Sequence, residues 1–130
     1  MTATLITAGV LGLLLLCLSG YVIAGRLRFK VSLGDGGNKE MQQRIRVQAN
    51  FIEYVPIALI LLMLVETSAI GPAWLPGALG TVLVIGRLWH AQGLLSRAGT
   101  SVGRFGGTNL TIMTILVSSL AVLGRGLHLW

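Results

Sequence analysis

No charged side chain occurs between Met1 and Gly25, and this run narrows the range of folds more than any other feature. Residues 5–24 are apolar and are long enough to cross a bilayer as one helix of about 20 residues. Arg26-Leu-Arg-Phe-Lys30 follows as a stop-transfer pattern, and the run has neither a preceding basic residue nor an A-x-A-like cleavage site. We therefore interpret it as a transmembrane helix and not as a signal peptide.

The composition points to the same class of protein. The 130 residues are 54% hydrophobic and 11% charged, whereas soluble domains carry roughly 25% charged residues. Ten Lys and Arg against four Asp and Glu give a net charge of +6, but basic and aromatic residues do not interleave as nucleic-acid binding requires. The single cysteine, Cys17, provides neither an intrachain disulfide nor a Cys-x-x-Cys pattern. We expect a membrane protein with no nucleic-acid partner.

Four apolar segments predict an all-α fold of one domain over residues 1–130. It is expected to be an integral membrane four-helix bundle, with transmembrane helices at about residues 3–27, 41–67, 75–96 and 107–127. Gly34-Asp-Gly-Gly-Asn38 predicts a tight turn, because it lacks the lysine and the hydroxyl residue of a phosphate-binding loop. Residues 96–107 are expected to form a loop, and Glu66 is expected to be solvated at the end of the second helix.

Lysine and arginine are distributed unevenly among the predicted loops. The third loop holds Arg97 and Arg104, and the second loop holds neither residue type. The first loop and its flanks hold Arg26, Arg28, Lys30, Lys39, Arg44 and Arg46. By the positive-inside rule, we expect the first and third loops to be cytoplasmic and both termini to be outside.

A polar stripe interrupts the second apolar segment. At about 100° per residue, Arg46, Asn50 and Glu53 fall within about 60° of one another on a helix. Arg87 and His90 lie three residues apart on one face of the third helix. They are expected on the same, cytoplasmic side of the membrane as this stripe. Ionisable groups inside a bilayer are costly and usually functional. Two purely structural alternatives stay open. Glu53 and Arg87 could form an ion pair between helices, or His90 could only hydrogen-bond a neighbouring helix.

A net-cationic cleft with one carboxylate and one amide suits a small ligand that carries several carboxylates and an amine. No nucleophile elbow and no HExxH motif is present, and His90 and His128 lie near opposite membrane faces, so no metal site is expected. Any catalysis would be electrostatic. An arginine would lower the pKa of a bound thiol, and the thiolate would attack an apolar substrate from the bilayer.

The pattern Arg46-x-Gln-x-Asn50-x-x-Glu53-Tyr54-x-Pro56 resembles the second-helix signature of the MAPEG family, the membrane-associated proteins in eicosanoid and glutathione metabolism. Gly86-Arg-Leu-Trp-His90 is similar to the third-helix motif of the prostaglandin E synthase branch. Gly34-Asp-Gly-Gly37 before Arg44-Ile-Arg46 is similar to the small bacterial members. The resemblance covers nearly the whole chain, and the second-helix motif is its specific part.

This resemblance implies a homotrimer in a bacterial inner membrane, with the cosubstrate glutathione held between neighbouring protomers. It implies a glutathione transferase or peroxidase that acts on lipophilic electrophiles, in contact with membrane lipid. Arg104 would be the catalytic residue that activates the thiolate. The glutathione-binding residues would be Arg26, Arg46, Asn50, Glu53, Arg87 and His90.

Several departures from the family pattern leave alternatives open. Leu94 replaces a glutathione-binding tyrosine, and Phe105 and Thr108 stand where the prostaglandin enzyme has serine and tyrosine hydroxyls. The loop before Arg104 differs in length, which makes Arg97 a rival for the thiol. One alternative function is a non-catalytic lipid-binding or scaffold member of the family. A four-span exporter of cationic compounds is less favoured, because the first span lacks the acidic residue that such transporters use.

Overall fold

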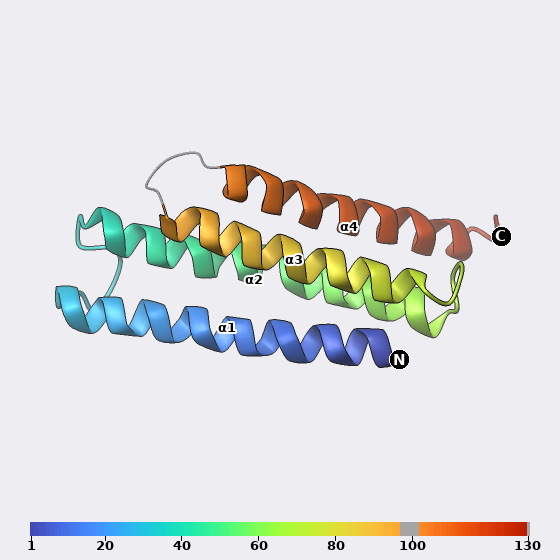
Figure 1. Ribbon diagram of the computed structural model, residues 1–130, viewed down its shortest axis with the longest axis horizontal. Coiled ribbons are helices and arrows are strands. Elements are labelled where there is room, and N and C mark those ends of the chain that lie inside the picture. The colour runs from blue at the N-terminus through green and yellow to red at the C-terminus, as the bar shows by residue number, and fades with distance from the viewer. Residues whose placement is uncertain (97–101, 130) are drawn as a thin grey trace.

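The protein is built from four long α-helices, as the sequence predicts. The computed structural model describes residues 1–96 and 102–129, and for residues 94–96 it describes the backbone alone. The helices are α1 (Thr2–Phe29), α2 (Lys39–Thr67), α3 (Leu75–Ser96) and α4 (Val102–Gly126). The described residues contain no strand, so the all-α prediction is confirmed (Figure 1).

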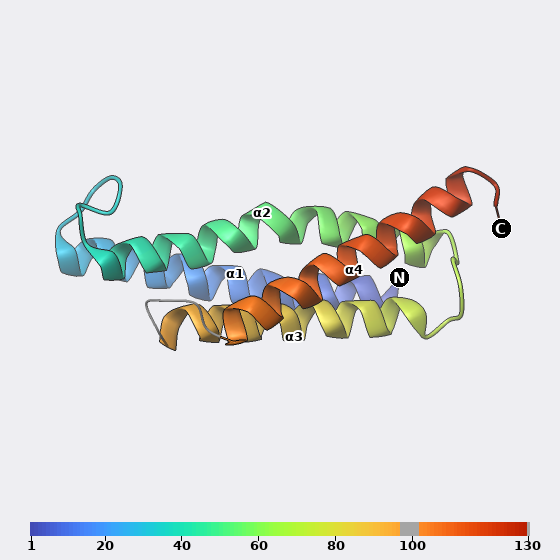
Figure 2. The same ribbon diagram turned by 90° about the horizontal axis from the view of Figure 1, so that it is seen from above.

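The helices lie side by side along the long axis of the molecule, with α2 and α3 between α1 and α4 (Figure 1). α1 packs on α2 and α3, and α4 packs on α3 and α2, whereas the described parts of α1 and α4 do not touch. Figure 2 shows α4 running obliquely across the bundle. The start of α1 and the end of α4 lie at the same end, opposite the turn between α1 and α2.

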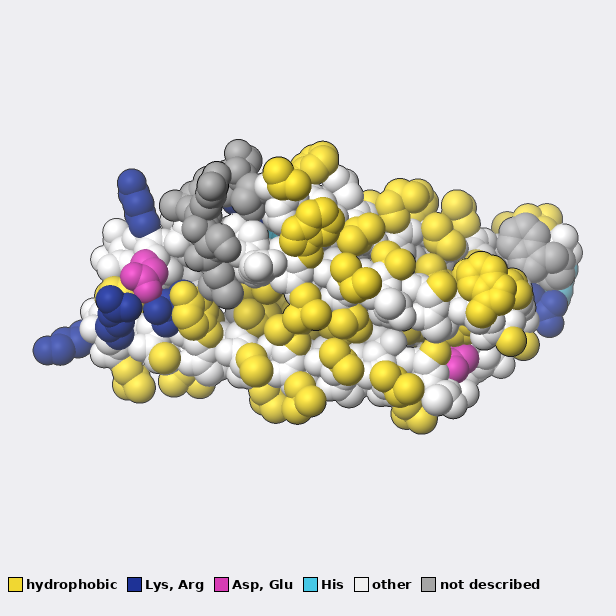
Figure 3. All heavy atoms as spheres, viewed as in Figure 1, with side chains coloured by type: hydrophobic (Ala, Val, Ile, Leu, Met, Phe, Trp, Pro, Cys, Tyr) yellow, Lys and Arg dark blue, Asp and Glu magenta, His cyan; other side chains and the backbone are white. Residues whose placement is uncertain are grey.

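The apolar exterior is that of a membrane protein. α1, α2 and α4 are each long and apolar enough to cross a bilayer. Figure 3 shows hydrophobic side chains over the middle of the molecule, while most Lys and Arg gather at the end that holds the α1–α2 turn. On α4 the large apolar side chains point outward, among them Ile112, Leu116, Leu120 and Leu123. In a soluble protein such side chains would face the core, so their outward position fits a surface that faces lipid.

α4 begins earlier than predicted, so the expected loop over residues 96–107 is wrong for residues 102–106. The reason is the packing of its glycines. A Cβ at Gly103 would lie 3.0 Å from the carbonyl oxygen of Trp89, and a Cβ at Gly107 would overlap the carbonyl oxygen of Gly86. Small residues let membrane helices approach closely, so glycines that look like loop residues in the sequence form a helix interface here.

The turn between α1 and α2 confirms the tight-turn prediction. Gly34, Gly36 and Gly37 have positive φ angles, which glycine adopts at little cost. The Asp35 carboxylate accepts a hydrogen bond of 2.9 Å from the N–H of Gly37. The Asn38 side chain then caps α2 by accepting a bond of 3.0 Å from the N–H of Met41.

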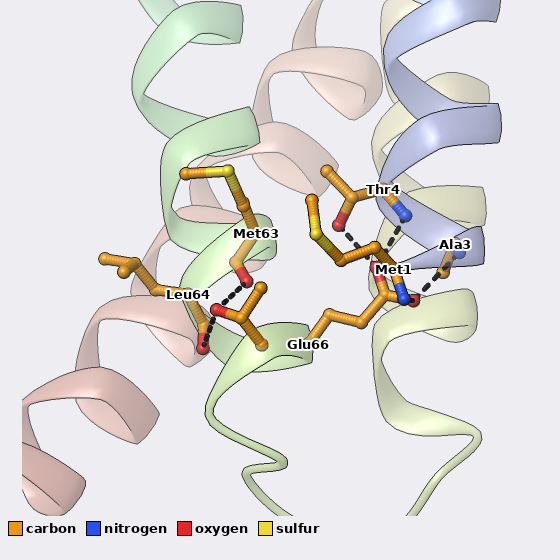
Figure 4. Close-up of polar contacts among 7 residues, drawn as sticks. Met1, Ala3, Thr4, Met63, Leu64 and Glu66 are labelled. Carbon is orange, nitrogen blue, oxygen red and sulfur yellow. Dashed lines mark hydrogen bonds and ion pairs between the residues drawn. The ribbon is translucent and has the colours of Figure 1, made fainter.

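Glu66 is not solvated as expected but caps the start of α1. Its carboxylate accepts hydrogen bonds from the N–H groups of Ala3 (2.9 Å) and Thr4 (2.8 Å) and from the Thr4 hydroxyl (2.6 Å). Figure 4 shows the side chain reaching across from α2 to α1. Free N–H groups and the positive end of the helix dipole attract an anion, and α1 supplies no acidic residue of its own in its first turn.

Candidate functional site

A polar hollow lies between α2, α3 and α4, toward the end of the bundle that holds the α1–α2 turn. Its volume is about 200 Å³, and its lining residues come from all three helices. They are Arg46, Asn50, His90, Arg104 and Thr108. Four of these five are residues that the sequence analysis singled out, so the fold brings the core of the predicted site together.

Arg46 lines this polar hollow, and Glu53 is not a lining residue but lies beside Arg46, so the two are called the rim pair. Their side chains are about half exposed, and an Arg46 guanidinium nitrogen lies 3.9 Å from a Glu53 carboxylate oxygen. An exposed pair at this distance contributes little to stability. Both charges therefore stay accessible to a ligand that carries an amine and a carboxylate.

Asn50 forms the inner wall of the polar hollow and contacts α3. The Nη1 group of Arg87 donates to its side-chain oxygen at 2.9 Å and lies 3.4 Å from its backbone oxygen. Arg87 is only 2% exposed and is not among the lining residues. The alternative of a Glu53–Arg87 ion pair is not found, because Glu53 pairs with Arg46 and Arg87 bonds Asn50.

Arg44 and Arg46 are two residues apart on α2 but face different neighbouring helices. Arg44 is buried against α1, where its guanidinium stacks 3.8 Å from the centroid of the Tyr21 ring and donates to the Tyr21 carbonyl oxygen at 2.9 Å. It also pairs with Glu40 at 2.7 Å. Two residues correspond to about 200° on a helix, so Arg44 faces away from the polar hollow and Arg46 faces into it.

Arg26 lies apart from the polar hollow and is not among its lining residues. Its Nη1 group donates to the carbonyl oxygens of Ser32 and Gly34 at 3.2 Å each, within the α1–α2 turn. α1 also has no contact with the described part of α4. Arg97 lies outside the described residues, so the rivalry between Arg97 and Arg104 stays a prediction.

Thr108 lines the polar hollow, although it is not one of the site residues predicted from the sequence. In the sequence it stands out only as a departure from the family pattern. It lies one helical turn after Arg104, and its hydroxyl donates to the Arg104 carbonyl oxygen at 2.9 Å. The i, i+4 spacing on a helix is the signal that pairs it with Arg104. Its oxygen remains able to accept a hydrogen bond at the polar hollow.

An apolar groove forms a second hollow, between α1 and α2, with a volume of about 270 Å³. Its lining is entirely apolar and includes Leu11, Leu15, Phe51, Val55, Pro56 and Leu59. This groove offers no group that binds a charge. It suits an acyl chain or another hydrocarbon.

The polar hollow can bind an anion and stabilise negative charge. Two guanidinium groups and the amide of Asn50 supply hydrogen-bond donors, and two cations in a partly enclosed site favour a carboxylate or a thiolate. None of the lining side chains is an acid or a thiol. A thiolate that reacts in this hollow would therefore have to arrive with the ligand.

Comparisons with known proteins identify the family to which the chain belongs. The sequence model of the MAPEG family matches residues 4–124. Two similar proteins are Inner membrane protein YecN of Escherichia coli strain K12 and its counterpart in Escherichia coli O6:H1 strain CFT073. Each is 39% identical over 85 residues, which cover 65% of this chain and 64% of the relative.

The match to these relatives spans just under two thirds of their length, whereas the family match spans nearly the whole chain. It runs from the first turn of α1 almost to the end of α4 and includes every residue that lines the polar hollow. The chain therefore belongs to the MAPEG family and is an integral membrane protein.

Proposed function

We propose that this protein is a glutathione-dependent membrane enzyme that conjugates glutathione to lipophilic electrophiles or reduces lipophilic peroxides with it. The observation that carries the proposal is the polar hollow, which joins Arg46, Asn50, His90 and Arg104 from three helices. Glutathione has two carboxylates, an amine, two amide groups and a thiol. The rim pair of Arg46 and Glu53 matches its charged ends, and Asn50 matches its backbone.

In this mechanism Arg104 stabilises the thiolate of bound glutathione. A nearby cation favours the thiolate over the thiol, and the proton passes to solvent. The sulfur then attacks an electrophilic carbon of a substrate that enters from the lipid, a carbon–sulfur bond forms, and the leaving group departs with its electron pair. The protein holds the ligand and stabilises charge, and no covalent intermediate on the protein is required.

A homotrimer in an inner membrane, with the α1–α2 turn facing the cytoplasm, completes the proposal. Arg26 lies apart from the polar hollow of its own protomer. In a trimer, α1 of a neighbouring protomer would place its Arg26 beside the bound glutathione. The positive-inside rule supports the cytoplasmic orientation, because the α1–α2 turn and its flanks are rich in Lys and Arg.

The test is turnover of a chloronitrobenzene by purified protein in detergent, together with the ultraviolet absorbance of the glutathione thiolate. We expect Arg104→Ala to lower the turnover number about 100-fold, as the loss of one charge-stabilising donor does in other enzymes, and to reduce the thiolate signal. Arg125→Ala, at the far end of α4, is the matched control and should retain both. Full activity in Arg104→Ala would contradict the assigned role.

The apolar groove favours a second candidate, a non-catalytic lipid-binding member of the family. Its hydrocarbon lining would hold an acyl chain without help from the polar hollow. Co-purified lipid together with an absence of glutathione-dependent turnover in wild-type protein would favour this candidate over the enzyme.

A further inference from the structure

Arg87 is the most deeply buried charged side chain among the described residues. It is 2% exposed, and its Nε and Nη2 atoms have no hydrogen-bond partner within the described part of the chain. The ion pairs found there do not include it. Burying a guanidinium without a carboxylate costs free energy, and ionisable groups within membrane helices are usually retained for function. Its hydrogen bonds to Asn50 indicate what that function is.

The contact fixes which way the Asn50 amide faces. A guanidinium only donates hydrogen bonds, so the atom that lies 2.9 Å from Arg87 Nη1 must be the Asn50 oxygen and not its nitrogen. The oxygen and the nitrogen point in different directions from the same carbon. Since Asn50 lines the polar hollow while its oxygen is held by α3, its NH₂ group is the part that remains for a ligand.

We propose that Arg87 is a positioning residue that locks the Asn50 amide with its NH₂ group toward the polar hollow, so that the inner wall recognises a carboxylate or carbonyl oxygen of the ligand. This inference rests on the proposed function to the extent that the ligand fills the polar hollow. It assigns Arg87 a role behind the lining, in place of direct contact with glutathione.

The orientation determines which ligand groups the inner wall accepts. With the NH₂ group inward, Asn50 adds a donor to those of Arg46 and Arg104, and the three together match an oxygen-rich group. A free amide could rotate and present its oxygen, which would repel a carboxylate. Arg87 removes this second orientation, because its N–H would otherwise face the amide NH₂.

A double-mutant cycle tests whether Arg87 acts through Asn50. The affinity for glutathione is measured by calorimetry in detergent for wild type, Arg87→Gln, Asn50→Ala and the double variant. We expect each single change to weaken binding about tenfold, as the loss of a hydrogen bond to a charged group does. The double variant should bind no more weakly than Asn50→Ala. Additive losses, about 100-fold in the double variant, would overturn the proposal.

Two further variants separate positioning from stability. Arg87→Lys keeps a charged donor on α3 and should recover part of the affinity that Arg87→Gln loses. Arg44→Gln removes the other buried arginine, which contacts α1 and not the polar hollow, and should lower thermal stability while leaving glutathione affinity unchanged. Equal loss of affinity in Arg44→Gln and Arg87→Gln would overturn the assignment of a specific role to Arg87.

Side-chain amide resonances give a readout that needs no glutathione. The chain has three asparagines, at positions 38, 50 and 109, so selective ¹⁵N labelling gives three NH₂ groups, and Asn50→Ala assigns one of them. We expect glutarate, a simple dicarboxylate, to shift the Asn50 signal in wild type and to shift it less in Arg87→Gln. Equal shifts in both proteins would overturn the inference. Absent glutathione binding with the expected glutarate shifts would overturn only the proposed function.

Discussion

At the scale of single residues, the polar side chains separate into those that hold the helices together and those that line the polar hollow or lie beside it. Arg44 and Arg46 show the difference, because one is buried against Tyr21 and the other lies on the rim of the polar hollow. Helical spacing predicts that they face different ways, but it does not say which of the two faces meets α1. That choice depends on packing between helices that are distant in the sequence.

Glu66 is the clearest structural residue in the protein, and its removal should be costly. Glu66→Ala takes three hydrogen bonds from the start of α1. We expect the free energy of unfolding to fall clearly, because a charged carboxylate that caps a helix forms stronger hydrogen bonds than a neutral cap. Thermal unfolding in detergent, followed by circular dichroism, measures the change.

Glu53→Ala is the matched control for this measurement. It removes an acidic residue from the same helix, but its ion pair with Arg46 is long and half exposed. Its effect on unfolding should be within about 0.5 kcal/mol. Equal destabilisation by the two substitutions would contradict the capping role of Glu66.

At the scale of the helices, the four elements follow from the apolar segments, and their boundaries differ from prediction where glycines are involved. The start of α4 at Val102 was missed, because Gly103, Gly106 and Gly107 resemble a loop in the sequence. Their helical role depends on α3, whose backbone lies against them. The stripe on α2 was predicted because it needs only the period of one helix, whereas the cap by Glu66 joins residues more than 60 positions apart.

The α3–α4 interface should tolerate no side chain at Gly107. A Cβ there would lie 2.7 Å from the Cβ of His90 and would overlap backbone atoms of α3. We expect Gly107→Ala to lower the free energy of unfolding by about 2 kcal/mol or more and to weaken ligand binding, because His90 must move with α3. Thermal unfolding and a glutathione titration measure the two effects.

Gly77→Ala provides the comparison on α3, since a Cβ at Gly77 meets nothing within 4 Å. Alanine is the better helix former by about 1 kcal/mol, so this variant should be as stable as wild type or slightly more stable. If Gly107→Ala were as well tolerated as Gly77→Ala, the close packing of α3 and α4 would not be what positions His90.

At the scale of the whole molecule, the bundle puts an apolar surface around the middle and a polar hollow near one end. The sequence predicted the converging residues on α2, α3 and α4 because charges in a membrane helix are rare enough to mark a site. It did not predict that Arg87 lies behind Asn50, or that Arg26 bonds its own turn, since both depend on side-chain contacts. Assembly into a trimer is part of the proposed function, and it also depends on contacts between side chains.

The most direct test is a structure of the protein in lipid nanodiscs with glutathione, determined by electron cryomicroscopy. We expect glutathione in the polar hollow, with its thiol beside Arg104, an oxygen on the Asn50 NH₂ group, and its charged ends near Arg46 and Glu53. Glutathione bound at another place would contradict the proposed site. Lipid in the polar hollow in place of glutathione, at saturating glutathione, would contradict it as well.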